Sequence, residues 1–144
     1  MDKALNYLAL ARKAGLAELG EEPVGVAAKA GHARLVLVAS DASDHTWRRA
    51  KSYVAGTNQQ LLRLPYTKDE MGSSVGRTSL AIAAITDVGM AASLAAALGD
   101  PAHKAVLEAL QEQAQKAKQR QKERKAHEKN KRMGKTAFRP VKKN

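Results

Sequence analysis

Apolar residues recur at two different spacings along the first part of the chain. Leu5, Leu8 and Ala9 lie three to four residues apart and predict a helix that ends at Gly15. The stretch Leu35–Ala39 is continuously apolar and has the length of a strand that is buried on both faces. Helical and strand-like segments therefore alternate from the start of the chain.

The same two spacings, together with capping residues, predict the remaining elements up to residue 98. They are a helix over 21–30, a helix that follows the caps of 40–43 and carries Trp47, Ala50 and Val54 on one face, a strand over 61–64, a short helix from Thr67 to about 72–76, a strand over 80–86 and a helix over 88–98. Alternating helices and buried strands predict an α/β fold, a three-layer α/β/α sandwich around a mixed, roughly four-stranded sheet.

The character of the sequence changes at Gly99 and Pro101, which suit the end of one helix and the start of the next. We therefore expect one domain over 1–99 and a basic, partly helical tail over 100–144. The tail opens with an apolar stripe at helical spacing, formed by Val106, Leu107, Leu110, Ala114 and Ala117. This stripe is expected to dock on the domain or on a partner.

Most of the positive charge belongs to the tail. The chain has a net charge of +11, of which residues 1–99 contribute +2 and residues 100–144 contribute +9. Such an excess favours an anionic partner, and RNA is preferred over a membrane because aromatic residues make up only 3% of the chain. The basic tail residues expected to contact RNA are Lys118, Arg120, Lys122, Arg124 and Lys125.

Residues with catalytic or metal-binding chemistry form no recognisable pattern. The chain has no cysteine, which excludes disulfides and thiolate metal sites and fits a reducing cytoplasm, where we expect the protein. Its four histidines lack metal-ligand spacing. The segment Gly72–Thr78 is similar to a phosphate-binding loop, but it has Arg77 where that loop has lysine, and a predicted strand follows. We expect no enzyme activity, no metal and no cofactor.

Several short segments together match the pattern of a known family. They are Ala11–Gly15, Gly20–Glu22, Ala33–Asp41, Met71–Gly76 and Leu80–Asp87. In their order and spacing, residues 5–98 resemble the kink-turn-binding ribosomal proteins, whose archetype is the archaeal large-subunit protein seven-Ae. The likeness is greatest to the short bacterial YlxQ-type branch. The resemblance implies a mixed sheet between helices, with RNA bound at one edge.

In that family the RNA surface combines the start of the second helix with the loop before the last strand. The resemblance assigns this role here to Gly20, Glu21, Glu22, Arg77, Thr78, Ser79 and Leu80. A helix N-terminus offers free N–H groups and a positive dipole end, and small loop residues allow a base to approach the backbone. Arg12 and Lys13 are further candidates for RNA contact.

The chain departs from the archetype where the second helix begins. The archetype has Gly-Thr-Asn-Glu and then a lysine three residues later, whereas this chain has Pro23 in place of that glutamate and Val26 in place of that lysine. Lys29, one turn beyond Val26, is expected to supply the charge on the same face. Glu22 can accept hydrogen bonds from the N1–H and N2–H groups of guanine. Glu21 and Glu22 also suit the first turn of a helix when no ligand is bound, because their negative charges complement the helix dipole.

These observations predict a non-catalytic, monomeric RNA-binding protein that is ribosome-associated or binds a structured, kink-turn-like RNA. The alternative is a protein-interaction adaptor that uses the 106–117 stripe to dock a partner helix. Trp47 is expected to belong to the core rather than to a base-stacking surface, and its basic neighbours Arg48, Arg49 and Lys51 are expected to form a solvated face.

Overall fold

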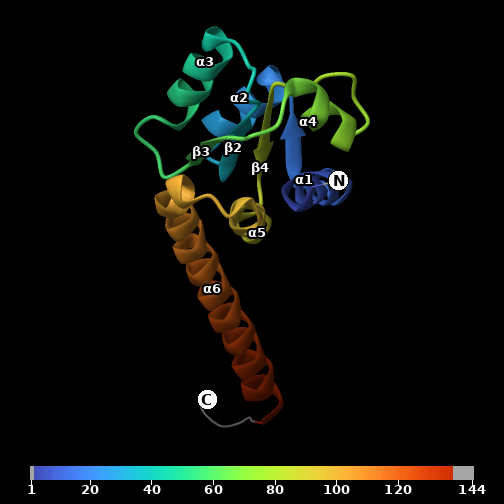
Figure 1. The fold of residues 1–144 in the computed structure, drawn as a ribbon. Coiled ribbons are helices and arrows are strands. Elements are labelled where there is room, and N and C mark those ends of the chain that lie inside the picture. Colours follow the sequence, from blue (N-terminus) through green and yellow to red (C-terminus); the bar gives the residue numbers. More distant parts are fainter. Residues whose placement is uncertain (1, 138–144) are drawn as a thin grey trace. The chain divides into compact units, whose positions relative to one another are not determined.

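The computed structural model describes the backbone of residues 2–137 and the side chains of residues 2–129 (Figure 1). Its elements are α1 (Lys3–Lys13), β1 (Ala17–Leu19), α2 (Glu21–Lys29), β2 (Leu35–Val38), α3 (Asp44–Val54), β3 (Gln60–Arg63), α4 (Lys68–Ser74), β4 (Ile82–Ile85), α5 (Val88–Leu98), the short 3-10 helix η1 (Pro101–His103) and α6 (Lys104–Ala137). The chain divides into two compact units, the first ending at Gln111 and the second beginning at Glu112.

The four strands form one mixed sheet in the order β1-β4-β2-β3. β2 and β3 are parallel, whereas β4 is antiparallel to both β1 and β2. The expected α/β architecture with a mixed sheet is confirmed. β1 is the strand that the sequence did not locate, because its three half-buried residues are too few to show a strand period.

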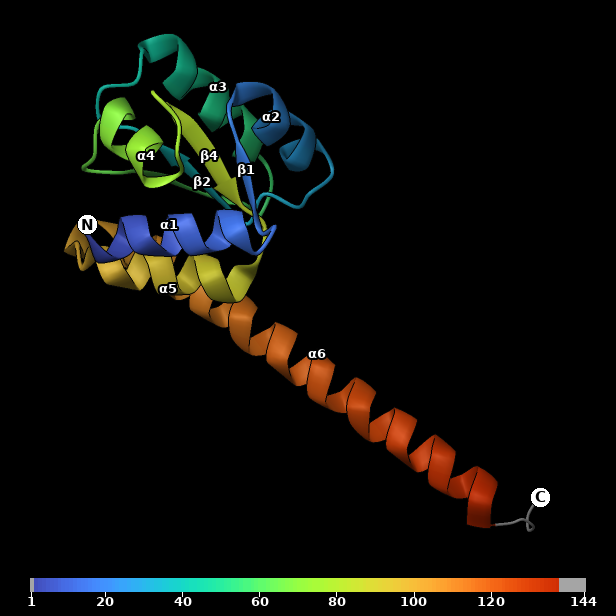
Figure 2. The same cartoon turned by 90° about the vertical axis from the view of Figure 1, so that its right-hand side faces the viewer.

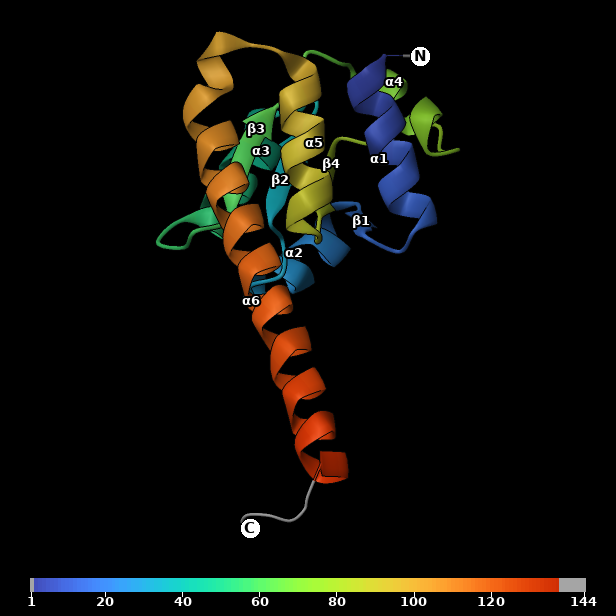
Figure 3. The same ribbon diagram turned by 90° about the horizontal axis from the view of Figure 1, so that it is seen from below.

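The sheet is covered on both faces by helices (Figure 2). Leu35 and Leu37 of β2 belong to one buried cluster together with residues of α1, α4 and α5. Val36 and Val38 alternate with them along the strand and belong to a second cluster with residues of α2 and α3. Figure 3 shows α1 and α5 side by side over the first face. A strand that is apolar at every position therefore serves two cores.

Several helix ends lie where capping residues predict them. The hydroxyl of Ser43 accepts a hydrogen bond from the Thr46 N–H at the start of α3. Thr67 and Glu70 form a reciprocal capping box at the start of α4, as their spacing predicts. Gly99 ends α5 in the left-handed conformation with φ of 62°.

The first unit extends past Gly99 because the beginning of α6 packs into its core. Leu110 is fully buried in the cluster of α1 and α5, and Val106 and Leu107 pack against that cluster. The part of the apolar stripe before Gln111 therefore docks on the protein itself. That residues 1–99 fold alone stays a prediction. Within residues 2–137, no helix is both long and apolar enough to cross a membrane.

Candidate nucleic-acid interface

Two segments that are distant in sequence meet at one end of the sheet. β1 pairs with β4 in antiparallel register, with Leu19 opposite Ala83. The Gly20 N–H continues this pairing and donates to the carbonyl of Ile82 over 3.0 Å. Because the end of one antiparallel strand lies beside the start of the other, the N-terminus of α2 is next to the loop that precedes β4.

Gly20 and Arg77 mark the point at which these segments approach. Gly20 has φ of +98°, and a Cβ atom built on it would lie 3.7 Å from Nη1 of Arg77. No side chain caps the N-terminus of α2, and no acidic side chain of the described residues forms an ion pair with Arg77. The Arg77 guanidinium gives this corner a cationic group for a phosphate, beside a first helical turn that also carries the carboxylates of Glu21 and Glu22.

The loop before β4 is held against α4 by its backbone. The Arg77 N–H donates to the carbonyl of Gly72 over 2.8 Å, and the Leu80 N–H donates to that of Lys68 over 2.9 Å. Arg77, Thr78 and Ser79 are exposed. Leu80 is only 3% exposed and packs in the core. Of the four residues assigned to this loop, three present side chains to solvent and Leu80 anchors the loop instead.

The two acidic residues of α2 have different surroundings. Oε1 of Glu21 lies 2.7 Å from Nε of Arg49 in α3, so an arginine of the neighbouring helix balances its charge. Glu22 is exposed, and within the described part of the chain it forms no ion pair. Glu22 is therefore the carboxylate that can accept from the edge of a guanine.

Val26 and Lys29 lie further along the same helix. Val26 is 66% exposed, which is unusual for a large apolar side chain. It lines two hollows, and it shares the one between α2 and α3 with Lys29. The charge of Lys29 is thus available on a face that also presents Val26, as one-turn spacing predicts.

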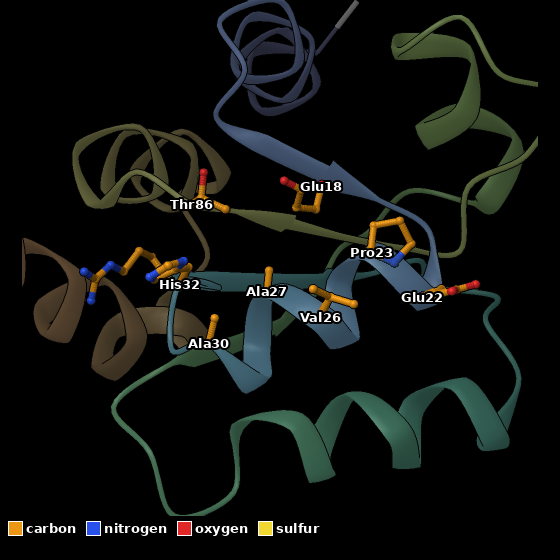
Figure 4. A pocket seen from close by; sticks show the side chains of 9 residues that line it. Glu18, Glu22, Pro23, Val26, Ala27, Ala30, His32 and Thr86 are labelled. Carbon is orange, nitrogen blue, oxygen red and sulfur yellow. The ribbon is translucent and has the colours of Figure 1, made fainter.

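The larger hollow is a groove of about 710 Å³ on the other side of α2. Val26 and Ala27 of α2 and the C-cap residue Ala30 form one wall, across from Glu18 of β1 and Thr86, which follows β4 (Figure 4). Glu22 and Pro23 also line this groove, which therefore begins at the α2 N-terminus. Its apolar wall offers contact to a flat or apolar group.

Arg12 and Lys13 lie at a different place in the fold. Both are exposed in the last turn of α1, just before β1. The start of β1 is joined to the end of β4, where the Thr86 N–H donates to the carbonyl of Leu16 over 2.8 Å. The length of β1 therefore separates them from the α2 N-terminus, and the structure does not bring them into the Gly20–Arg77 corner.

The basic tail residues lie on α6 in the second unit, and all five are exposed. Lys118, Lys122 and Lys125 follow four- and three-residue spacing and share one face of the helix, while Arg120 and Arg124 form a neighbouring row. This unit buries none of these five charges, so all of them are available to a ligand.

Arg49 and Tyr53 belong to the surroundings of this site, although no pattern in the sequence selects them. They are four residues apart on α3, and Nε of Arg49 lies 3.4 Å from the hydroxyl of Tyr53. Helical spacing predicts that these two side chains can meet, but only the packing of α3 on α2 brings them to Glu21. In the part of the chain with described side chains, no three His, Asp or Glu residues are grouped to hold a metal ion.

Comparison with known proteins identifies relatives of this fold among solved structures. No protein-family model and no curated protein matches the chain. A protein of unknown function from Bacillus halodurans is similar over 69% of this chain and 100% of its own, with 26% identity and a TM-score of 0.64. A 15.5 kD RNA-binding protein from Giardia lamblia is similar over 74% of this chain and 85% of its own, with 17% identity and a TM-score of 0.56. The chain therefore shares its fold with an RNA-binding protein.

Proposed function

We propose that this chain is a non-catalytic RNA-binding protein that is ribosome-associated or recognises a structured, kink-turn-like RNA. The observation that carries the proposal is the approach of Arg77 to Gly20, which joins the α2 N-terminus and the loop before β4 into one corner. These are the two segments to which the family resemblance assigns RNA contact.

The chemistry of this corner suits RNA. Uncapped N–H groups and a guanidinium attract phosphate, while the exposed carboxylate of Glu22 accepts from a guanine edge. Thr78 and Ser79 are small and exposed, so a splayed base can approach the loop closely. The fold shared with the Giardia RNA-binding protein gives independent support.

The tail supplies affinity rather than recognition in this proposal. Residues 100–144 carry +9 of the net charge of +11, and exposed lysine and arginine side chains release counterions when they contact phosphates. The domain would then select the shape of the RNA, and α6 would strengthen binding to any RNA.

The adaptor alternative has less surface available to it. Leu110 is buried, and Val106 and Leu107 pack against the core of the first unit. Of the 106–117 stripe, the half-buried Ala114 and Ala117 are the apolar residues beyond that unit. Two alanines offer little area to a partner helix, so we favour RNA.

Binding of the full chain to a kink-turn RNA and to a plain hairpin, measured at several salt concentrations, tests the proposal. Arg77→Ala should weaken binding to both RNAs and reduce the log–log salt slope by about 0.7 to 0.9, the contribution of one phosphate contact. Arg63→Ala removes the same charge from β3, where Arg63 lies 4.4 Å from the Trp47 ring centroid. It should leave the slope unchanged. If the full chain binds neither the kink-turn RNA nor the hairpin, the proposal is refuted.

A second variant tests the tail without shortening the chain. Lys118, Arg120, Lys122, Arg124 and Lys125 are replaced together by glutamine. On single-stranded RNA the salt slope should fall by about 0.7 for each phosphate that the variant no longer neutralises, while the preference for the kink-turn over the hairpin should remain. An unchanged slope would remove the tail from RNA binding.

A further inference from the structure

A second hollow, of about 440 Å³, lies between α2 and α3. Glu21 and Glu22 line its beginning at the α2 N-terminus together with Arg49, which pairs with Glu21, and Lys29 lines it further along α2. Because both glutamates also belong to the start of α2, this hollow begins at the same helix N-terminus as the Gly20–Arg77 corner. A strand of RNA that contacts the corner can therefore extend into it.

Arg49 is the most firmly held basic side chain in this hollow. Its Nε lies 2.7 Å from Oε1 of Glu21 and 3.4 Å from the hydroxyl of Tyr53. Both contacts are made through Nε. The side chain is 51% exposed, so the outer end of the guanidinium remains open to a ligand while its inner edge is fixed.

Gly25 explains how Tyr53 comes to lie against α2. A Cβ atom built on Gly25 would be 3.1 Å from the Tyr53 hydroxyl oxygen and 3.3 Å from its Cζ atom. Glycine inside a helix costs about 1 kcal/mol relative to alanine, and here it makes room for the phenol. The hydrogen bond with Tyr53, followed by the charges of Tyr53 and Glu21, raises the pKa of Arg49 above its ordinary value.

We propose that Arg49 and Lys29 form a second phosphate-binding site in the α2–α3 hollow, occupied by a backbone phosphate of the RNA that also contacts Arg77. Arg49 contacts the phosphate through its Nη groups, since a guanidinium fork matches two phosphate oxygens. Glu21 and Tyr53 are positioning residues that hold Nε. This inference rests on the proposed function, and it gives Arg49 a role beyond the solvated face that the sequence predicts.

Arg48 provides a matched control one residue away. It is exposed on the same helix, its Nε donates to the carbonyl of Asp44 over 3.4 Å, and it does not line the hollow. In the full chain, Arg49→Ala should weaken binding to the kink-turn RNA at least about fivefold and lower the salt slope by about 0.7 to 0.9. Arg48→Ala should change the affinity less than about twofold and leave the slope unchanged.

The outcomes separate this inference from the function on which it rests. If the unsubstituted chain binds neither RNA, the proposed function fails and the phosphate site fails with it. If the unsubstituted chain binds RNA and the two arginine variants behave alike, only the phosphate site is overturned. Thermal unfolding checks that each variant is folded, and Arg49→Gln, which retains much of the side chain, replaces Arg49→Ala if the latter is unfolded.

Tyr53→Phe tests the positioning role because it removes one hydroxyl and no charge. It should weaken RNA binding about two- to threefold in the unsubstituted chain and have no further effect when combined with Arg49→Ala. If the role of Tyr53 is purely structural, Tyr53→Phe should lower the melting temperature and should reduce the affinity equally in the unsubstituted chain and in Arg49→Ala. That second result would overturn the assignment of Tyr53 as a residue that acts through Arg49.

Discussion

Gly72 of α4 lies so close to Ser79 that no larger residue fits between them. A Cβ atom built on Gly72 would be 2.8 Å from both Cα and N of Ser79 and 2.9 Å from the carbonyl oxygen of Arg77. All three are backbone atoms, so a side chain at residue 72 must displace the loop that carries the candidate RNA contacts. The shape of the proposed interface therefore depends on a glycine that lies outside it.

We expect Gly72→Ala to lower the free energy of unfolding by about 1 to 3 kcal/mol, the usual cost of overpacking. It should also weaken RNA binding, because Arg77 moves with the loop. Urea unfolding and RNA titration measure the two effects. Gly89→Ala in α5 is the control, since the nearest atom there is one side-chain oxygen, Oδ2 of Asp87 at 3.3 Å, and no backbone atom of the described residues outside that helix lies within 4 Å. Equal stability and affinity in both variants would contradict this account of Gly72.

Leu110 tests whether the beginning of α6 packs into the core of the first unit. Its side chain is fully buried, so Leu110→Ala should destabilise the protein by about 2 to 5 kcal/mol through reduced apolar burial and a residual cavity. Leu107→Ala, at a partly buried position of the same helix, should cost less. Denaturant unfolding gives both values. A Leu110→Ala variant as stable as the unsubstituted chain would show that α6 does not pack there in solution.

Truncated chains test where the first unit ends. A chain ending at Gln111 retains Leu110, whereas a chain ending at Gly99 lacks it together with Val106 and Leu107. Both should unfold cooperatively, the shorter one at the lower temperature, because a domain of about 100 residues buries roughly 60 to 70% of its unfolded surface. If the shorter chain has no cooperative thermal transition, the domain expected over residues 1–99 is wrong.

Glu22 tests specificity separately from charge. If its carboxylate binds a guanine edge, Glu22→Ala should reduce the preference for a kink-turn with sheared G·A pairs over a plain hairpin by about 1 to 3 kcal/mol, by analogy with base contacts in DNA. Competition between the two RNAs at fixed salt measures this ratio. Glu108→Ala removes an equal charge from an exposed position of α6 outside the candidate interface and should leave the ratio unchanged. An unchanged ratio in Glu22→Ala would leave Glu22 with only its effect on the helix dipole.

Tyr66 should make stability depend on alkaline pH. Burial, followed by the hydrogen bond and charge of Asp2 and the charge of Glu70, raises the pKa of Tyr66 from 10.0 to about 12. Below pH 10 the phenol is protonated in both states, so its contribution to stability is fully present. Between pH 10 and about 12 the unfolded chain ionises first, and stability falls. The stability of Tyr66→Phe should depend less on pH in this range than that of the unsubstituted chain. If the two depend on pH equally, the raised pKa of Tyr66 is contradicted.

Local pattern alone accounts for much of the first unit. The continuous apolar run of β2 predicts a strand buried on both faces, and its alternate residues do enter two cores. The capping residues of α3, α4 and α5 lie where the helices begin or end. These features depend on neighbouring residues and on which side chains avoid water, so they are expressed directly in the order of amino acids.

The candidate interface depends on contacts that have no local signature. β1 is too short to show a period, and its pairing with β4 joins Leu19 to Ala83. That pairing brings Gly20 to Arg77, and the packing of α3 on α2 brings Arg49 to Glu21. The sequence determined the elements other than β1, the caps and the basic tail, because each follows from propensity or charge. Only the tertiary structure decided which exposed side chains meet, because residues distant along the chain are brought together by burial of the two cores.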